Sequence, residues 1–195
     1  ISETVQRLGL SPAANEPHGL LRLRRQALRL SAFFDIPGIL TLGGEAFGKL
    51  MDGQRLHPDI REAVMQLGAW NSGETAFNWL IQQIAAAASE QDRINALRAL
   101  GCFNETGQIE KALDYALNNT PDRNKFIPVA MMAQNPAAVP MLWEWYTNHH
   151  EDLAGVHPLI HERIIGAVVP FGGLDRREAV RSFCDARFKE TDAAA

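Results

Sequence analysis

The chain has 195 residues, of which 46% are hydrophobic and 22% are charged. It is therefore long enough to bury a substantial core, either as one domain or as a modular array. Its net charge of −4 provides no basic field that would attract a nucleic-acid backbone, so we expect no nucleic-acid partner. The two cysteines, Cys102 and Cys184, form no CxxC pair. This spacing argues against a disulfide scaffold and against a cysteine-rich zinc site.

The sequence contains no apolar run of about 18 residues, the length that a membrane-spanning helix requires. Its first residues have neither the charged nor the apolar region of a signal peptide. We therefore expect a cytoplasmic protein with no membrane partner. The chain does not begin with methionine and ends in ETDAAA. We interpret it as a piece of a longer protein.

Apolar residues in the first part of the chain recur at three- and four-residue steps, the spacing of one buried helix face; they are Leu20, Leu23, Ala27, Leu30 and Phe34. The first predicted helix begins at Leu20 and ends near Asp35. A second runs from Leu40 to Met51, and a third begins at Pro58, where the missing N–H of proline costs nothing. We expect further helices at about 75–88, 90–102, 107–117, 123–133, 139–149, 158–169 and 176–189.

Every apolar period is helical and none has the two-residue period of a strand. We therefore predict an all-α fold. Helix pairs recur about every 30 to 45 residues, which favours an array of two-helix repeats over a bundle. We interpret Gly43-Gly44 and Gly172-Gly173 as turn glycines and not as phosphate-binding loops, because neither pair follows a strand.

Two segments repeat the same helix-start pattern: HPDIREAV begins at His57 and HPLIHERI begins at His157. Each places a polar residue at the cap, a proline in the first turn and an apolar stripe after it. We therefore expect both histidines at helix starts. The same pattern predicts that Ile60 and Ile160 are buried.

His161-Glu162 is the first half of the zinc-peptidase motif HExxH, but Ile165 stands where the second histidine would be. His157 belongs at the cap, outside the regular geometry that a two-histidine metal face requires. We expect no metal ligand and no catalytic residue in this chain. Cys184 has no evident base partner and is predicted to be a buried structural residue.

Arg22, Arg25 and Arg29 recur at helical spacing and therefore share one face. The simplest interpretation is that such a charged face is exposed to solvent. If it lined a cavity, it would bind a carboxylate by bidentate hydrogen bonds, which makes the three arginines candidate substrate-binding residues. All four tryptophans are expected to wedge between helices, which is their commonest use. They are Trp70, Trp79, Trp143 and Trp145.

Several motifs taken in order resemble one known family. The segment from Leu97 to Phe103 is followed by ALDYAL at 112–117, by Asn135-Pro136, and by two tryptophans in the helix after it. Gly172-Gly173 and Phe183-Cys184 come next, and LGLSPAANEPHGLLRLRRQAL lies at the start. This order and spacing is similar to the C-terminal helical domain of zinc aminopeptidases of the aminopeptidase N, puromycin-sensitive and endoplasmic-reticulum types.

The resemblance implies one helical-repeat domain over residues 1–195, an α–α superhelix of stacked antiparallel helix pairs of the HEAT or armadillo kind. It implies a non-catalytic C-terminal domain that walls a substrate cavity and limits access to it. Zinc is then expected in the missing catalytic domain, with that domain and peptide substrates as partners. The alternative is a free-standing α-solenoid that binds a protein or peptide partner on its concave face.

Overall fold

The computed structural model describes residues 1–171 and 176–187, and all regular structure within them is helical. The all-α prediction is confirmed. Within the same residues, no helix combines the length and the apolar character that crossing a membrane requires. The chain divides into two compact units, Ile1–Ala112 and Leu113–Ala195.

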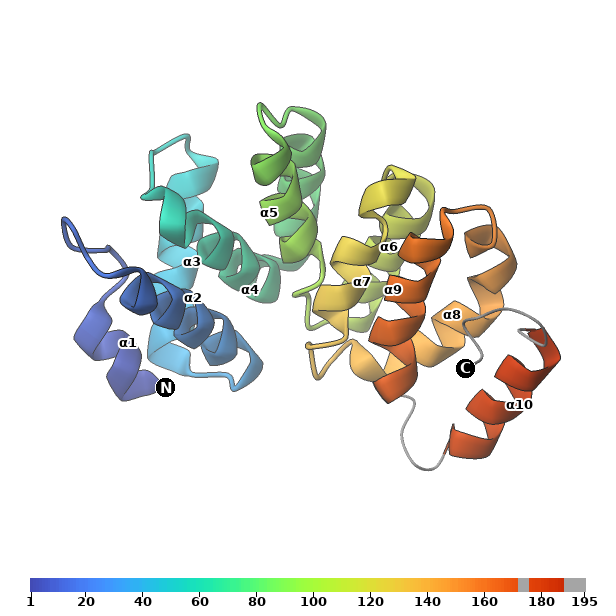
Figure 1. The fold of residues 1–195 in the computed structure, drawn as a ribbon. Coiled ribbons are helices and arrows are strands. Elements are labelled where there is room, and N and C mark those ends of the chain that lie inside the picture. The colour runs from blue at the N-terminus through green and yellow to red at the C-terminus, as the bar shows by residue number, and fades with distance from the viewer. Residues whose placement is uncertain (172–175, 188–195) are drawn as a thin grey trace. The chain divides into compact units, whose positions relative to one another are not determined.

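The first unit is built from helices that follow one another along the chain (Figure 1). The short first helix was not predicted, because its seven residues show no clear apolar period. The helices are α1 (Ser2–Leu8), α2 (His18–Phe33), α3 (Pro37–Met51), α4 (Pro58–Ala85), α5 (Glu90–Leu100) and α6 (Thr106–Asn118), which continues into the second unit.

The second unit continues the helical pattern. The helix predicted at 123–133 is a single turn of 3-10 helix, η1, followed by α7. Gly172-Gly173 lies outside the described residues. The elements after α6 are η1 (Asp122–Asn124), α7 (Phe126–Met132), α8 (Val139–Leu153), α9 (Pro158–Val168), η2 (Val169–Phe171) and α10 (Arg177–Arg187).

Helix α4 is two helical stretches that meet at Gly73, where the backbone adopts φ 43° and ψ −119°. Glycine reaches this conformation easily because it has no Cβ. The two stretches run in different directions (Figure 1). The sequence indicated this break, since it predicted one helix beginning at Pro58 and another beginning at Thr75.

The prediction that Gly43 and Gly44 form a turn is wrong, because both lie inside α3. A Cβ on Gly43 would lie 2.8 Å from the side chain of Leu67 in α4. A Cβ on Gly68 would lie 2.2 Å from the ring of Phe47 in α3. The glycines therefore allow α3 and α4 to pack closely, and each accommodates a large side chain of the other helix.

The buried face of α2 differs from the face that the apolar spacing suggested. Ala27 is buried as expected, but Leu23 is 41% exposed and Phe34 is 67% exposed. The buried residues of α2 include Arg24, whereas the sequence pattern places its neighbour Leu23 on the buried face. The core around α2 consists of Val5, Ala27, Leu28, Ala32, Ile39, Ala63, Leu67 and Trp70.

The connection from α2 to α3 is held by Asp35, which has a positive φ of 47°. The Ile36 N–H donates to the Ser31 carbonyl at 3.0 Å, which closes the end of α2 in the manner of a Schellman motif. The indole N–H of Trp70 donates to the Asp35 carboxylate at 3.0 Å. The α2–α3 turn is thereby tied to α4.

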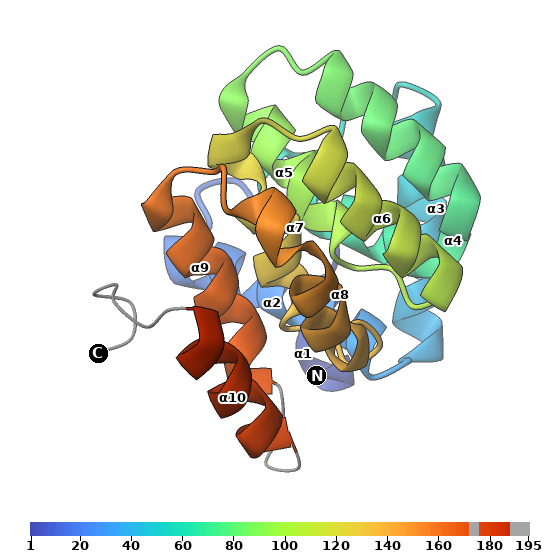
Figure 2. The same cartoon turned by 90° about the vertical axis from the view of Figure 1, so that its right-hand side faces the viewer.

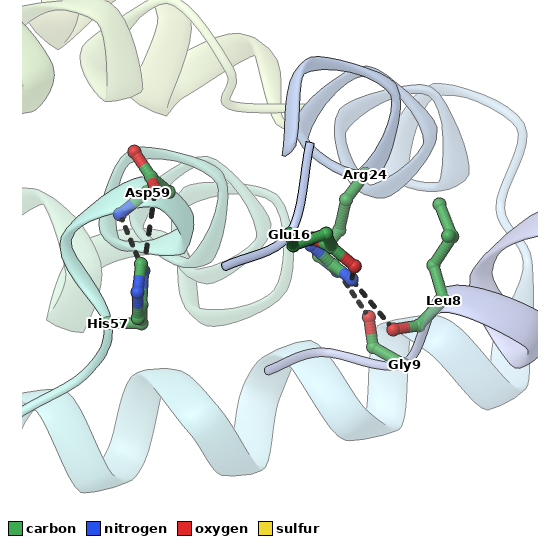
Figure 3. A network of polar contacts seen from close by, with 6 residues as sticks. All are labelled: Leu8, Gly9, Glu16, Arg24, His57 and Asp59. Atoms are coloured by element: carbon green, nitrogen blue, oxygen red, sulfur yellow. Dashed lines mark hydrogen bonds and ion pairs between the residues drawn. The ribbon is translucent and has the colours of Figure 1, made fainter. Parts of the chain in front are cut away.

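Arg24 connects α2 to the segment that follows α1 (Figure 3). Its side chain is 1% exposed, and it forms an ion pair with Glu16, whose side chain is 9% exposed. The second hydrogen bond of this pair, from Nη2 to Oε1, is 2.7 Å long. Arg24 also donates to the Leu8 carbonyl at 2.9 Å and to the Gly9 carbonyl at 3.0 Å. One buried cation thus holds the end of α1, the following loop and α2 together.

The hydrogen bonds from Arg24 lower the pKa of Glu16, although partial burial opposes the effect. The same hydrogen bonds raise the pKa of Arg24. Both shifts favour the charged forms of the pair. A buried ion pair adds little net stability compared with an apolar pair, but the loss of one partner is costly.

Replacing Arg24 with methionine should therefore destabilise the chain by about 3 kcal/mol, because Glu16 and two carbonyls lose their donor. Arg22→Met on the exposed side of the same helix is the matched control and should change stability by less than about 0.5 kcal/mol. Urea unfolding followed by circular dichroism measures both. Equal effects of the two substitutions would contradict a structural role for Arg24.

Acid should weaken this contact in a way that depends on Glu16. Because the folded-state pKa of Glu16 lies below its ordinary value of 4.5, the stabilisation is complete above pH 4.5 and is lost as pH falls through the folded-state pKa. Glu16→Gln should remove this part of the acid dependence. The free energy of unfolding measured at several pH values, for both proteins, tests the expectation; parallel pH profiles would refute it.

Gly68→Ala should cost about 2 kcal/mol, because the new Cβ overlaps the buried ring of Phe47. Gly48→Ala is the matched control in α3, since a Cβ there meets nothing within 4 Å. It should stabilise the chain by about 0.5 to 1 kcal/mol, the usual gain when alanine replaces glycine within a helix. Thermal unfolding measures the change in stability of both variants. A Gly68→Ala substitution that stabilises the chain would rule out close packing of α3 and α4.

Candidate functional site

The three candidate arginines lie on α2, away from its buried face. Arg22 is exposed, whereas Arg25 and Arg29 are half-buried. At about 100° per residue, their common face is rotated by roughly 120° from the centre of the buried residues. Arg29 also donates to Gln26 at 2.6 Å. The helix therefore presents the arginines together on one face, hereafter the arginine face.

Arg24 is the residue that the sequence pattern missed. It stands between Arg22 and Arg25 in the chain but points to the opposite side of the helix, where it meets Glu16 (Figure 3). Grouping the arginines by helical period separated it from the other three without showing what it binds. Glu16 is eight residues away in a loop, and nothing in the sequence pattern pairs the two.

Cys102 lies in the interior of the first unit and is not a nucleophile. Burial raises the pKa of its thiol to about 12, despite the opposing effect of the Arg29 charge. Its Sγ donates weakly to the Arg98 carbonyl, 3.7 Å away. The charge of Glu62 raises the pKa further. The nearby charges therefore do not create the thiolate that nucleophilic chemistry requires.

His57 and His157 cap the two helices that they precede, as the repeated helix-start pattern predicted. The Asp59 N–H donates to Nδ1 of His57 at 3.3 Å, and the Leu159 N–H donates to Nδ1 of His157 at 3.2 Å. Figure 3 shows the first of these caps. The isoleucines of both segments, Ile60 and Ile160, are buried. The repeated sequence is therefore a repeated structural device.

His161 is engaged with α8. Its Nε2 lies 3.0 Å from the hydroxyl of Tyr146, and the two rings pack at 5.9 Å. Burial lowers the pKa of His161, and the charge of His150 adds to this effect. Burial also raises the pKa of Tyr146 to about 12. Within residues 1–171 and 176–187, no group of three or more His, Cys, Asp or Glu side chains is arranged to hold a metal ion.

Helix α10 contacts α8 through Phe183. Figure 2 shows the course of these two helices. The Phe183 ring contacts Trp143 at 5.5 Å and His150 at 5.1 Å. Arg187 lies over the same ring at 4.6 Å and donates from Nε to Nε2 of His150 at 2.6 Å. The next residue, Cys184, is half-buried, so the prediction that this cysteine is buried is wrong.

The tryptophans mostly fill spaces between helices. Trp70 packs against Phe33 of α2 at 5.5 Å, and Trp79 packs against Phe47 of α3 at 5.2 Å. Trp143 joins α8 to α10 through Phe183. Trp145 is different, because its ring contact is with His149 in its own helix.

Asn135 occupies the turn before α8, where the resemblance places a helix start. It is fully buried, and its side-chain oxygen accepts from the Ala137 N–H at 3.0 Å. Its carbonyl accepts from the N–H groups of Ala138 and Val139, both at 3.0 Å. A residue with these bonds is difficult to replace, which explains the asparagine at this position of the motif.

The sequence is similar to a known family along almost its whole length. A sequence model of the ERAP1-like C-terminal domain matches residues 1–194. Probable aminopeptidase 2 of Sulfurisphaera tokodaii is 28% identical over 142 residues, which are 70% of this chain and 18% of that protein. Aminopeptidase 2 of Candida albicans is 23% identical over 176 residues, or 88% of this chain and 19% of that protein.

Glutamyl aminopeptidase of Bitis rhinoceros is 25% identical over 158 residues, covering 80% of this chain and 16% of that protein. The chain spans less than a fifth of the length of each of these three relatives. The family match is independent of these partial alignments and extends from the first residue to the last but one. The chain therefore belongs to the ERAP1-like C-terminal domain family.

Proposed function

We propose that this chain is the non-catalytic C-terminal domain of a zinc metallo-aminopeptidase that removes N-terminal residues from peptides. Three relatives of which it matches less than a fifth bear the names of aminopeptidases. In this proposal the zinc ion and the catalytic residues belong to another part of the same polypeptide. The role of the domain is structural: it forms one wall of the peptide cavity and restricts which peptides the cavity can enclose.

The arginine face is the observation that supports contact between this domain and the peptide substrate. Three cations share one side of α2, and none of them belongs to the buried residues of that helix as Arg24 does. A guanidinium group presents a planar fork of donors that matches a carboxylate. A wall that displays Arg22, Arg25 and Arg29 toward the cavity would attract and orient the acidic groups of a peptide.

The proposed partners are the catalytic part of the same polypeptide and peptide substrates. The cytoplasm is the proposed location, since both cysteines are free thiols in the described residues. A free-standing solenoid remains the competing function. The coding sequence upstream of Ile1 separates the two: an HExxH segment supports the aminopeptidase, whereas a start codon immediately upstream supports the solenoid.

Substitution of the arginine face in the intact protein tests the proposal. Arg22→Gln, Arg25→Gln and Arg29→Gln should include at least one variant whose KM for long peptides rises about fivefold, the effect of one lost charge-assisted contact at a partly exposed site. Cleavage of a single aminoacyl nitroanilide should not change, because that substrate is too short to reach a distant wall. Steady-state kinetics with both substrates gives the comparison.

Two controls make this result specific. Arg7→Gln removes an exposed arginine from α1 and should leave both activities unchanged. A long peptide with an amidated C-terminus and no acidic side chain should be insensitive to all four substitutions, since it carries no carboxylate. Unchanged kinetics on acidic long peptides in all three arginine-face variants would contradict contact between this face and substrate.

A further inference from the structure

A pocket of about 540 Å³ lies in the first unit, at the junction of α3 and α4. The end of α3 contributes Leu50, the α3–α4 loop contributes Arg55 and Leu56, and the start of α4 contributes Arg61. Trp79 and Gln83 come from the second stretch of α4. The volume lies within the range of sites that hold small organic molecules.

The turn at Gly73 creates this pocket. In a continuous helix, Pro58 and Trp79 would lie about 30 Å apart, at 1.5 Å per residue. Both nevertheless line the same pocket. The positive φ of Gly73 therefore brings an aromatic side chain back to the first turn of the same helix.

The charged side of the pocket consists of arginines. Among the described residues that line it, Arg55 and Arg61 are charged and none is acidic. Arg61 donates from Nη1 to Asp92 at 3.2 Å, and its Nε is buried without an acceptor. Arg55 is exposed. The ion pair with Asp92 positions Arg61 without using all of its donors, so the pocket offers guanidinium donors to an anion.

The other side is apolar. Leu50 is buried and Leu56 and Trp79 are half-buried. The edge contact of Trp79 with Phe47, at 82° between the ring planes, fixes the orientation of the indole. An apolar group placed against these side chains would bury surface that water now covers. These side chains favour an anion with an apolar body over a bare inorganic ion.

We propose that this pocket binds a small organic carboxylate that carries an aromatic or aliphatic group. The carboxylate meets Arg55 and Arg61, and the apolar group lies against Leu56 and Trp79. The site is separate from the arginine face of α2 and uses different residues. It does not depend on the proposed aminopeptidase function, so either can fail without the other.

Titration of the isotopically labelled 195-residue chain with 3-phenylpropanoate tests the site. The indole N–H resonance of Trp79, assigned through Trp79→Phe, should shift and saturate with a Kd of about 1 to 10 mM, as expected for exposed charges and one partly buried ring. The neutral 3-phenylpropanamide should give no saturable shift. Arg55→Gln should weaken binding of the acid by about fivefold or more.

The controls separate a built site from general attraction to a cation. Arg7→Gln removes an exposed arginine elsewhere and should leave the Kd unchanged, and the other indole resonances should be the same in both arginine variants. Equal shifts with the acid and the amide would overturn the proposal. So would saturable binding of inorganic phosphate with the same Kd, or an Arg55→Gln variant that binds as tightly as the unchanged chain.

Discussion

The buried ion pair between Arg24 and Glu16 determines how α2 lies in the first unit. Arg24 donates to both oxygens of Glu16 and to two backbone carbonyls at the end of α1. A guanidinium group in the core is tolerated only when its donors are satisfied, and here they are satisfied by groups from one short segment. This requirement fixes the rotation of α2 about its axis.

The rotation of α2 also determines where its other arginines lie. Because Arg24 faces inward, the arginine face, which lies on another side of the helix, is turned away from the core. An apolar pair at positions 16 and 24 would pack as well, but it would not select one of the leucine-rich faces of this helix. The polar contact therefore provides specificity of arrangement rather than a large gain in stability, and the arginine face is its result.

The sequence predicted the features that depend on local spacing. The helix starts at Pro58 and Pro158, their histidine caps and the burial of Ile60 and Ile160 all follow from the order of a few neighbouring residues. The break in α4 was also visible, because the apolar period stops around Gly73. The family was recognised from motifs that include Asn135, whose buried hydrogen bonds hold the start of α8.

The features that depend on distant partners were not predictable from spacing. Gly43 was interpreted as a turn residue, because its role requires Leu67 from another helix. Leu23 was assigned to the apolar face of its helix, because nothing local shows that Arg24 meets Glu16 in the core. The α3–α4 pocket likewise joins residues that are distant along the chain, such as Arg55 and Trp79.

We propose that the arginine face lies toward bound peptide in the intact protein. A long acidic peptide that carries a photoreactive group near its C-terminus tests this most directly, with cross-linked residues identified by mass spectrometry. Cross-links to α2, at or beside Arg22 and Arg25, are expected and should be reduced by excess unlabelled peptide. Cross-links confined to parts of the protein outside residues 1–195, with none on α2, would contradict the claim.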